Sequence, residues 1–434
     1  MWAGARAPSK GLPASSIPAL AFDQLPSYGK DVTAHIGAQA ASTAMVLDNL
    51  VTLPIAKHFN FTGSGKILQH DQARTRSLRD RAITRATGTP PPSSEVGSVP
   101  ITNQIIAYTA FVKIGAPPTG YTLVIDTGSA NTWVGAEQPF VTTSSTRDTG
   151  NDVAMSYGHG KAMSGVEVTD TVTLSPGLTV SGQSIGVSAV SSGFASFDGV
   201  LGLGPVGLSV GSLTPQSGAQ VATVTQNLYT QGSITSEVVS MFFEPSTEGI
   251  IGELTFGGTD PTKFTGQISY AGITDIYPSS EYFGVNQYVT YTRTKTLLSY
   301  NPGIFDAGTT LVLLATDVFA KYIDMVGAEY DEDTQLFRIT PAQYENLQSM
   351  FFTINALVCE FTANAQIWPR HLNSMIGGSP DYVYLIIADI GWPFGLGMDI
   401  INGMLFLERF YTVLDTTNNR VGIAYTQYTD NTTN

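Results

Sequence analysis

The strongest constraint on the fold is a strand-and-turn pattern that occurs twice. Residues 124–129 read VIDTGS, and residues 304–309, 180 positions later, read IFDAGT. In each copy, an apolar run typical of a buried strand ends in an Asp-x-Gly turn. An apolar pair and a glycine follow the first copy at 200–202, and a less perfect version follows the second at 401–403. We therefore expect two halves of like design, each with one such turn.

Most of the chain has the pattern of an all-β protein. After residue 95, short Val/Thr/Ile/Tyr runs alternate with Gly, Ser, Asn and Pro about every eight to twelve residues. Helices are expected to be few. Residues 316–327 have helical apolar spacing, and Thr340 before Pro341 is typical of an N-cap followed by a proline at the first helical position.

Charge divides the chain near residue 95. Residues 1–95 hold ten Lys/Arg and six Asp/Glu, whereas residues 96–434 hold eleven and 29. The net charges are therefore +4 and −18, and the first part can complement the second. A body this acidic repels phosphate backbones, which argues against nucleic-acid binding. The TPPPSS segment at 89–94 is typical of an exposed, semi-rigid linker and predicts a boundary there.

Asp126 and Asp306, the aspartates of the two turns, are suited to act as an acid–base pair. Two carboxyls within hydrogen-bonding range cannot both ionise easily, so they share a proton, and one acts as a base while the other acts as an acid. Water is then the nucleophile. The hydroxyls of Ser129 and Thr309 can hold the outer oxygens. The alternative, that each Asp-x-Gly is only an ordinary turn, is weakened by its repetition at two strand ends.

Several segments resemble the pepsin-like aspartic peptidases. They are 126–135 (DTGSANTWVG), 156–160 (SYGHG), 197–204 (FDGVLGLG), 306–311 (DAGTTL), 357–370 (LVCEFTANAQIWPR) and 403–415. The resemblance runs from about residue 98 to the C-terminus. It implies a bilobal fold, with two β-barrel-like lobes at 98–275 and 276–434 and a central cleft between them. Residues 1–97 would then be an N-terminal extension and propeptide, because 53–58 and 72–74 resemble the propeptides of fungal members.

The resemblance also implies roles for individual residues. Asp126 and Asp306 match the two catalytic aspartates, which Thr127 would support. Tyr157 matches the flap tyrosine that closes over a bound peptide, and Trp133 matches the indole that hydrogen-bonds this tyrosine. The expected substrate-binding residues are Gly128, Ser129, Tyr157, Gly158, His159, Gly308 and Thr309. No cofactor and no metal ion are expected.

Two positions depart from the family's pattern. Ala307 stands where the family usually has Thr or Ser, so Thr127 can brace the aspartates from one side only. His159 stands where some fungal members carry an aspartate that favours a basic residue beside the cleaved bond, so that preference is not carried over. His159 is either exposed on a mobile hairpin or in contact with substrate. In contact, it would be cationic in acid and favour acidic or polar peptides.

Together these features predict an acid endopeptidase made as a zymogen. Its partners would be extended polypeptide substrates, bound as an added strand, and its own propeptide. Lys57 and Lys66 are the candidates to approach the aspartates in the zymogen. A monomer is expected, with no nucleic-acid or membrane partner. The main rival is a catalytically weakened homologue that binds peptides or a protein, which only Ala307 favours. A carbohydrate-binding β module has no separate support.

Location and modification are less constrained. The resemblance implies secretion, with the vacuole as an alternative, although residues 1–30 hold only scattered apolar residues and no clear export signal. Asn60 and Asn431 occupy Asn-x-Thr sequons, which accept glycans only on the secretory route. Cys359 is the only cysteine, so no disulfide can form within the chain, and we expect it to fill the interior of a strand.

Overall fold

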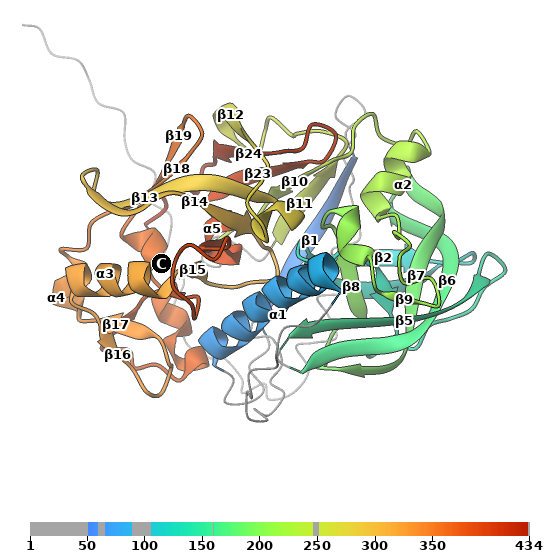
Figure 1. Ribbon diagram of the computed structural model, residues 1–434, viewed down its shortest axis with the longest axis horizontal. Helices are drawn as coiled ribbons and strands as arrows, with labels where there is room; N and C mark the ends of the chain where they lie inside the picture. The colour runs from blue at the N-terminus through green and yellow to red at the C-terminus, as the bar shows by residue number, and fades with distance from the viewer. Residues whose placement is uncertain (1–50, 60–65, 89–105, 159, 246–250, 433–434) are drawn as a thin grey trace, which may run out of the picture. The chain divides into compact units, whose positions relative to one another are not determined.

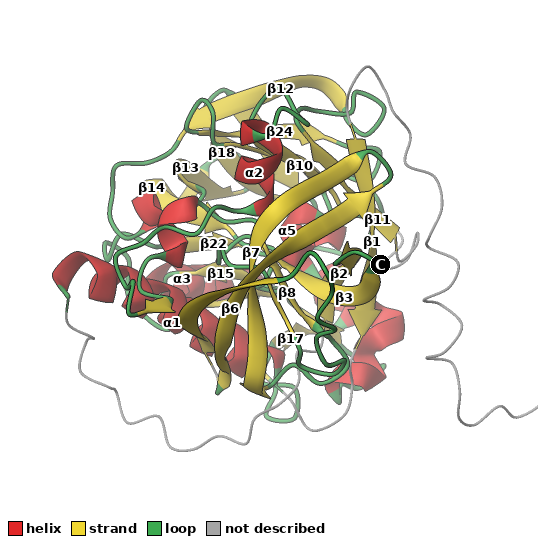
Figure 2. Ribbon diagram, turned by 90° about the vertical axis from the view of Figure 1, so that its right-hand side faces the viewer, coloured by secondary structure: helices red, strands yellow, loops and turns green. Residues whose placement is uncertain are grey.

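The computed structural model describes residues 51–59, 66–88, 106–158, 160–245 and 251–432. All of them belong to one compact unit, residues 43–434. Strands dominate this part of the chain, as Figure 2 shows, so the all-β prediction is confirmed. The predicted linker at 89–94 lies outside the described residues.

The strands form three sheets. In spatial order, the 14-stranded sheet contains β12 (Thr265–Gly272), β24 (Arg420–Tyr425), β23 (Phe410–Asp415), β10 (Val238–Phe242), β11 (Ile251–Phe256), β1 (Val51–Phe59), β2 (Ile106–Ile114), β3 (Thr119–Asp126), β8 (Gly199–Gly202), β4 (Trp133–Val134), β7 (Leu178–Ser192), β6 (Lys161–Ser175), β5 (Arg147–Gly158) and β9 (Leu213–Thr214). The seven-stranded sheet contains β19 (Leu357–Phe361), β18 (Met350–Ile354), β13 (Gly284–Tyr291), β14 (Lys295–Phe305), β22 (Ile400–Asn402), β15 (Val312–Leu314) and β21 (Ile387–Asp389). The small third sheet contains β16 (Glu329–Tyr330), β17 (Phe337–Ile339) and β20 (Val383–Tyr384).

The helices are mostly short. They are α1 (Ile67–Thr87), α2 (Val224–Thr230), α3 (Thr316–Val326), α4 (Pro341–Tyr344) and α5 (Met404–Leu407), with 3-10 turns at Val206–Ser209, Ser279–Glu281, Asn364–Gln366 and Arg370–Ile376. Helices α3 and α4 begin at the predicted places. Thr340 caps α4 by accepting the backbone N–H of Gln343, and the Gln343 side chain returns to the Thr340 N–H.

Helix α1 was not predicted, although at 21 residues it is the longest of the described helices. Its sequence is rich in Arg, Asp, Gln and Thr, so its apolar stripe is thin. The only apolar side chains that it buries are Ile67, Leu78 and Ala82. Most helix stability in proteins comes from tertiary packing, and α1 packs against β5 of the large sheet and β21 of the seven-stranded sheet. Figure 1 shows α1 running between the N-terminal strands and the C-terminal half.

Strand β1 also comes from the segment expected to be a propeptide. It lies inside the 14-stranded sheet, antiparallel to β11 on one side and to β2 on the other. Ile55 is opposite Gly252 on β11 and Ala110 on β2. Leu53 and Ile55 are buried. This part of the N-terminal segment is therefore an integral strand of the sheet rather than a surface appendage.

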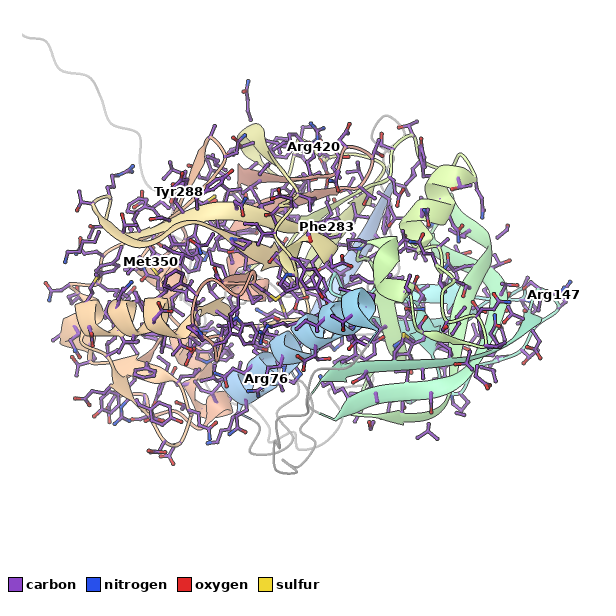
Figure 3. All side chains as sticks on the ribbon, viewed as in Figure 1. Arg76, Arg147, Phe283, Tyr288, Met350 and Arg420 are labelled. Carbon is purple, nitrogen blue, oxygen red and sulfur yellow. The ribbon has the colours of Figure 1, made fainter. Side chains whose placement is uncertain are left out.

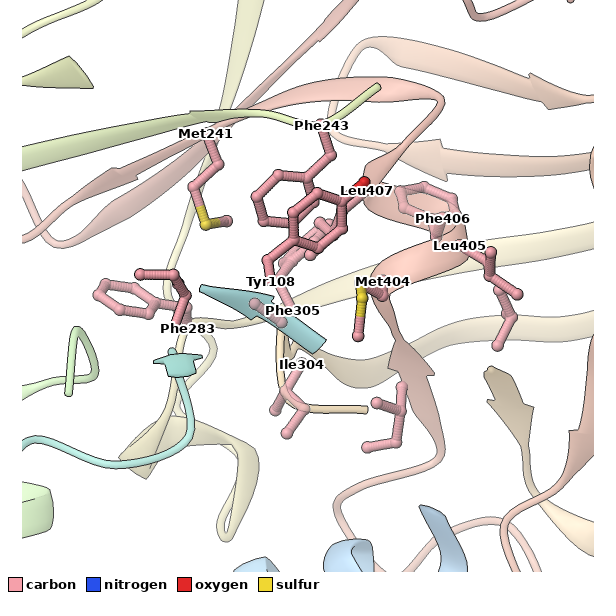
Figure 4. Close-up of a cluster of buried hydrophobic side chains, with 14 of the residues drawn as sticks. Tyr108, Met241, Phe243, Phe283, Ile304, Phe305, Met404, Leu405, Phe406 and Leu407 are labelled. Atoms are coloured by element: carbon pink, nitrogen blue, oxygen red, sulfur yellow. The ribbon is translucent and has the colours of Figure 1, made fainter. Parts of the chain in front are cut away.

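A buried apolar cluster joins the two large sheets (Figure 4). Tyr108 of β2 stacks on Phe243 with ring centroids 4.2 Å apart, and Phe305 of β14 lies beside Phe406 of α5. Phe305 immediately precedes Asp306, so this core supports the second aspartate turn. Cys359 is fully buried on β19, as expected, and its burial raises the pKa of the thiol.

Candidate active site

The two aspartate turns are built in the same way. Asp126 ends β3, which runs parallel to β8, and Asp306 directly follows β14, which runs parallel to β22. Strand β8 pairs antiparallel with β4, and β22 pairs antiparallel with β15. The apolar-pair-and-glycine segments noted in the sequence are β8 and β22 with the glycine that follows Asn402. The internal repeat of the sequence is therefore a repeat of structure.

Each aspartate is held by its own turn. The Ser129 hydroxyl donates to Asp126 Oδ2, and the Thr309 hydroxyl donates to Asp306 Oδ2, both at 2.5 Å. The backbone amides of the two glycines donate to the Oδ1 atoms, from Gly128 at 2.9 Å and from Gly308 at 3.2 Å. Both carboxyls are almost fully buried. The predicted turn residues therefore surround the carboxylates as the sequence suggested.

Thr127 links the two turns. Its hydroxyl donates to the carbonyl oxygen of Phe305 at 3.2 Å and accepts the backbone N–H of Ala307 at 2.9 Å. The Ala307 side chain has no hydroxyl with which to return the contact. The expectation that the aspartates are braced from one side only therefore agrees with this geometry.

The side chain of Arg74 in α1 lies between the two aspartates. Its Nη2 donates to Asp126 Oδ1 at 2.5 Å and to Asp306 Oδ1 at 2.6 Å, and its Nε donates to Asp306 Oδ2 at 2.7 Å. Since a single nitrogen reaches both carboxyls, they face one another across a space the size of one polar atom. Burial alone would raise the pKa of Asp126, but the charge of Arg74, helped by the bonds from Ser129 and Gly128, lowers it below the ordinary value.

The cation between the aspartates differs from the predicted one. Lys57 lies in β1 and forms a buried ion pair with Glu408, and Lys66 donates to the backbone carbonyl of Asp333. The prediction that one of these lysines approaches the aspartates is therefore wrong. Arginine suits the position better, because its planar guanidinium can bridge two carboxylates at once. The sequence shows a basic segment but not which cation reaches this point.

Helix α1 makes further polar contacts with both turns. Asp71 accepts the backbone N–H groups of Thr310 and Leu311 at 3.0 and 2.8 Å, and Arg81 donates to the carbonyl oxygen of Gly128 at 3.1 Å. Burial raises the pKa of Asp71 to about 7, although the two amides act in the opposite direction. Sequence analysis missed Asp71 and Arg81, since nothing in their spacing relates them to turns so distant in the chain.

Tyr157 and Trp133 meet as predicted. The Trp133 indole N–H donates to the Tyr157 hydroxyl at 2.8 Å, and Phe194 packs edge-on against both rings. Burial and the charge of Asp126 raise the pKa of Tyr157, so its hydroxyl stays protonated. Tyr157 lies near the tip of the β5–β6 hairpin (Arg147–Ser175), close to Asp126.

Helix α1 covers the predicted substrate-binding glycines. A methyl group at Gly308 would lie 2.3 Å from the Arg74 guanidinium, and one at Gly158 would lie 2.6 Å from the carbonyl oxygen of Ala73. At Gly158 the α1 backbone and a φ of +84° both require glycine, whereas at Gly308 the close atoms are the flexible end of the Arg74 side chain. His159, also predicted to bind substrate, lies outside the described residues.

Two further findings concern metal ions and membranes. Within the described ranges, no three His, Cys, Asp or Glu side chains are grouped so that they could hold a metal ion. None of the described helices combines the length and the hydrophobicity needed to cross a membrane.

Comparison with known proteins identifies the family. Residues 107–426 match the family described as eukaryotic aspartyl protease. The chain is 52% identical to polyporopepsin of Irpex lacteus over 340 residues, which cover 78% of this chain and 99% of that protein. It is 29% identical to human gastricsin, over 73% of this chain and 81% of that protein. The crystal structure of the aspartic proteinase from Irpex lacteus matches with a TM-score of 0.73 and 51% identity, over 76% of this chain and 96% of that one.

These matches confirm the predicted pepsin-like, bilobal fold and an enzymatic function. They overturn the carbohydrate-binding alternative, because the family match spans most of the chain. The chain therefore belongs to the eukaryotic aspartyl protease family and is a pepsin-like aspartic endopeptidase.

Proposed function

We propose that Asp126 and Asp306 activate one water molecule for the hydrolysis of peptide bonds, and that the protein is made as a zymogen in which α1 blocks this pair. The observation that carries the proposal is the bridging nitrogen of Arg74, which lies 2.5 and 2.6 Å from the two Oδ1 atoms. A water molecule in the same place would be in hydrogen-bonding range of both carboxyls.

In the reaction, one carboxylate accepts a proton from the water as it attacks the peptide carbonyl carbon. The other, protonated carboxyl donates its proton to the carbonyl oxygen, and a tetrahedral intermediate forms without an acyl-enzyme. The pair shares one proton and titrates as a unit. The hydroxyls of Ser129 and Thr309 keep the outer oxygens oriented. This mechanism favours an active enzyme over a weakened peptide-binding homologue, because Ala307 removes one brace but no group that takes part in the chemistry.

The substrate is a polypeptide in extended conformation, bound where α1 now lies. Gly128, Tyr157, Gly158 and Gly308 would line its path, with His159 beside it. Residues 98–275 and 276–434 would form the two lobes, and residues 1–97 the extension and propeptide. The enzyme acts as a monomer and is secreted, and a vacuolar location is the alternative.

Acid would release α1 through the aspartates. With α1 docked, Arg74 lowers the pKa of Asp126. The contact therefore stabilises docking fully at pH values above the pKa that Asp126 has after release. This stabilisation is lost as the pH falls through the lower pKa that Asp126 has in the docked state. Asp71 acts with the opposite sign. With α1 docked, the pKa of Asp71 is raised to about 7. Protonation of Asp71 therefore favours docking increasingly as the pH falls from about 7 towards the ordinary pKa of an aspartate. Release at low pH therefore depends on Asp126 and Arg74, not on Asp71.

The test is to incubate the full-length protein at about pH 3.5 and at neutral pH. In acid, the chain should shorten near residue 95 and gain peptidase activity. Arg74→Gln should raise activity at neutral pH, because the bridge between the carboxyls is lost. Arg76→Gln, on the same helix (Figure 3), is the matched control and should stay blocked. A precursor that neither shortens nor gains activity in acid would contradict the proposal.

A further inference from the structure

Lys161 is a buried lysine near Asp126. It is the first residue of β6, pairs with Gly158 across the hairpin, and is only 4% exposed. Its ammonium nitrogen lies 5.8 Å from the centre of the Phe194 ring. Lysine is seldom buried, because removing an ammonium group from water is costly. Neither the sequence patterns nor the reaction chemistry accounts for a cation at this position.

Lys161 lines a small cavity beside Asp126. Asp126 and Gly308 of the two aspartate turns line it. The remaining walls from the body of the enzyme are aromatic or aliphatic side chains, namely Val124, Tyr157, Phe194 and Val200. The last wall is supplied by α1, through His70 and Arg74. When α1 leaves, this cavity becomes a side-chain pocket directly beside the reacting atoms.

Charged and titratable groups of α1 and β3 lie around Lys161. Helix α1 contributes Arg74, Asp71 and the titratable ring of His70, and β3 contributes Asp126. Burial, followed by the charge of Arg74, lowers the pKa of Lys161 to about 7, while Asp71 and Asp126 raise it. At the acid pH at which α1 leaves, the side chain is therefore a cation.

We propose that Lys161 determines specificity in the released enzyme, by selecting substrates that place a glutamate side chain in this pocket and disfavouring those that place lysine or arginine there. The inference rests on the function proposed above. The methylenes of a glutamate can pack on Phe194 and Val200 while its carboxylate bonds the Lys161 ammonium. Such a charge-assisted bond is strong where water is excluded. A cationic side chain would meet a like charge in the same pocket.

The test uses the full-length protein after acid activation and two series of peptides. Each series varies one residue flanking the cleaved bond, on one side or the other, among Glu, Gln, Leu and Lys. In one of the series, the wild-type kcat/KM should be at least about 100-fold higher for Glu than for Lys, and Lys161→Met should reduce this ratio at least about tenfold. Lys161→Arg should keep the preference. Lys113→Met, which removes an exposed lysine from β2, is the matched control and should not change the ratio.

The pH dependence separates a charge effect from a structural one. The wild-type preference for Glu over Gln should grow between about pH 3 and 5, as the peptide carboxyl ionises, and Lys161→Met should lose this rise. Lys161→Gln should behave in the same way, in case the apolar variant folds poorly. If Leu peptides are cleaved but the Glu/Lys ratio of kcat/KM is the same in wild type and Lys161→Met, the proposed role of Lys161 is overturned while the proposed function stands. If wild type cleaves no peptide, the proposed function fails and this inference fails with it.

Discussion

The turns around Asp126 and Asp306 can be compared atom by atom. In both, the hydroxyl three residues later donates to Oδ2 at 2.5 Å, and the amide two residues later donates to Oδ1. The residue directly after the aspartate differs. Thr127 contacts the opposite turn through its hydroxyl, whereas Ala307 contributes only a backbone N–H. Each carboxylate is thus held by residues of its own turn in the same way, whereas the two turns are joined by the side chain of Thr127.

Helix α1 treats the two turns differently as well. It offers a cation to the first, since Arg81 donates to the Gly128 carbonyl, and a carboxylate to the second, since Asp71 accepts the amides after Thr309. Arg74 contacts both. One helix can therefore bind both turns of the repeat with different side chains. The first turn offers a backbone carbonyl, which needs a donor, and the second offers backbone amides, which need an acceptor.

The largest expected effect tests whether the two carboxyls are equally necessary for peptidase activity. Asp126→Asn and Asp306→Asn should each lower peptidase activity at least about 10³-fold, because each removes one member of the acid–base pair. Hydrolysis of an unfolded protein at acid pH measures this effect, and circular dichroism checks that both variants fold. The symmetry is broken if either variant keeps more than about a tenth of the wild-type activity.

A smaller effect is expected at the single brace. Thr127→Val keeps the shape of the side chain but leaves the Ala307 N–H and the Phe305 carbonyl without their partner. The free energy of unfolding of the precursor at neutral pH should fall by about 2 kcal/mol, and kcat should fall more than KM changes, because the carboxyls lose alignment. Thr127→Ser keeps the hydroxyl and should keep most of the wild-type free energy of unfolding and most of the wild-type kcat. Equal stabilities of the Val and Ser variants would show that the hydroxyl does not brace the pair.

The smallest effect is expected from restoring the missing brace. By the symmetry of the two turns, the hydroxyl introduced by Ala307→Thr would face the Ile125 carbonyl. One net hydrogen bond is worth about 1 kcal/mol, which should raise the melting temperature by about 1–3 °C. Ala307→Val adds the same bulk without the hydroxyl and serves as the control. A melting temperature of Ala307→Thr that stays level or falls contradicts the prediction.

Much of the site was predictable because its residues are close in sequence. Each aspartate and the hydroxyl that holds it are three residues apart, and that spacing alone brings them together in a turn. Trp133 and Tyr157 were paired only through the family resemblance. Arg74, by contrast, lies 232 residues from Asp306. Residues 72–74 resemble the propeptides of fungal members, but nothing in this pattern shows that Arg74 reaches the aspartates.

The β architecture, the internal repeat and the two held carboxylates follow from the amino-acid sequence, because they depend on the strand period, on turn chemistry and on short spacings. Three features emerge only in the folded chain: β1 is an internal strand, α1 places Arg74 rather than a lysine between the aspartates, and Lys161 lies near Asp126. These features depend on long-range packing and on the burial of charge. Both quantities come into being only when distant segments fold together.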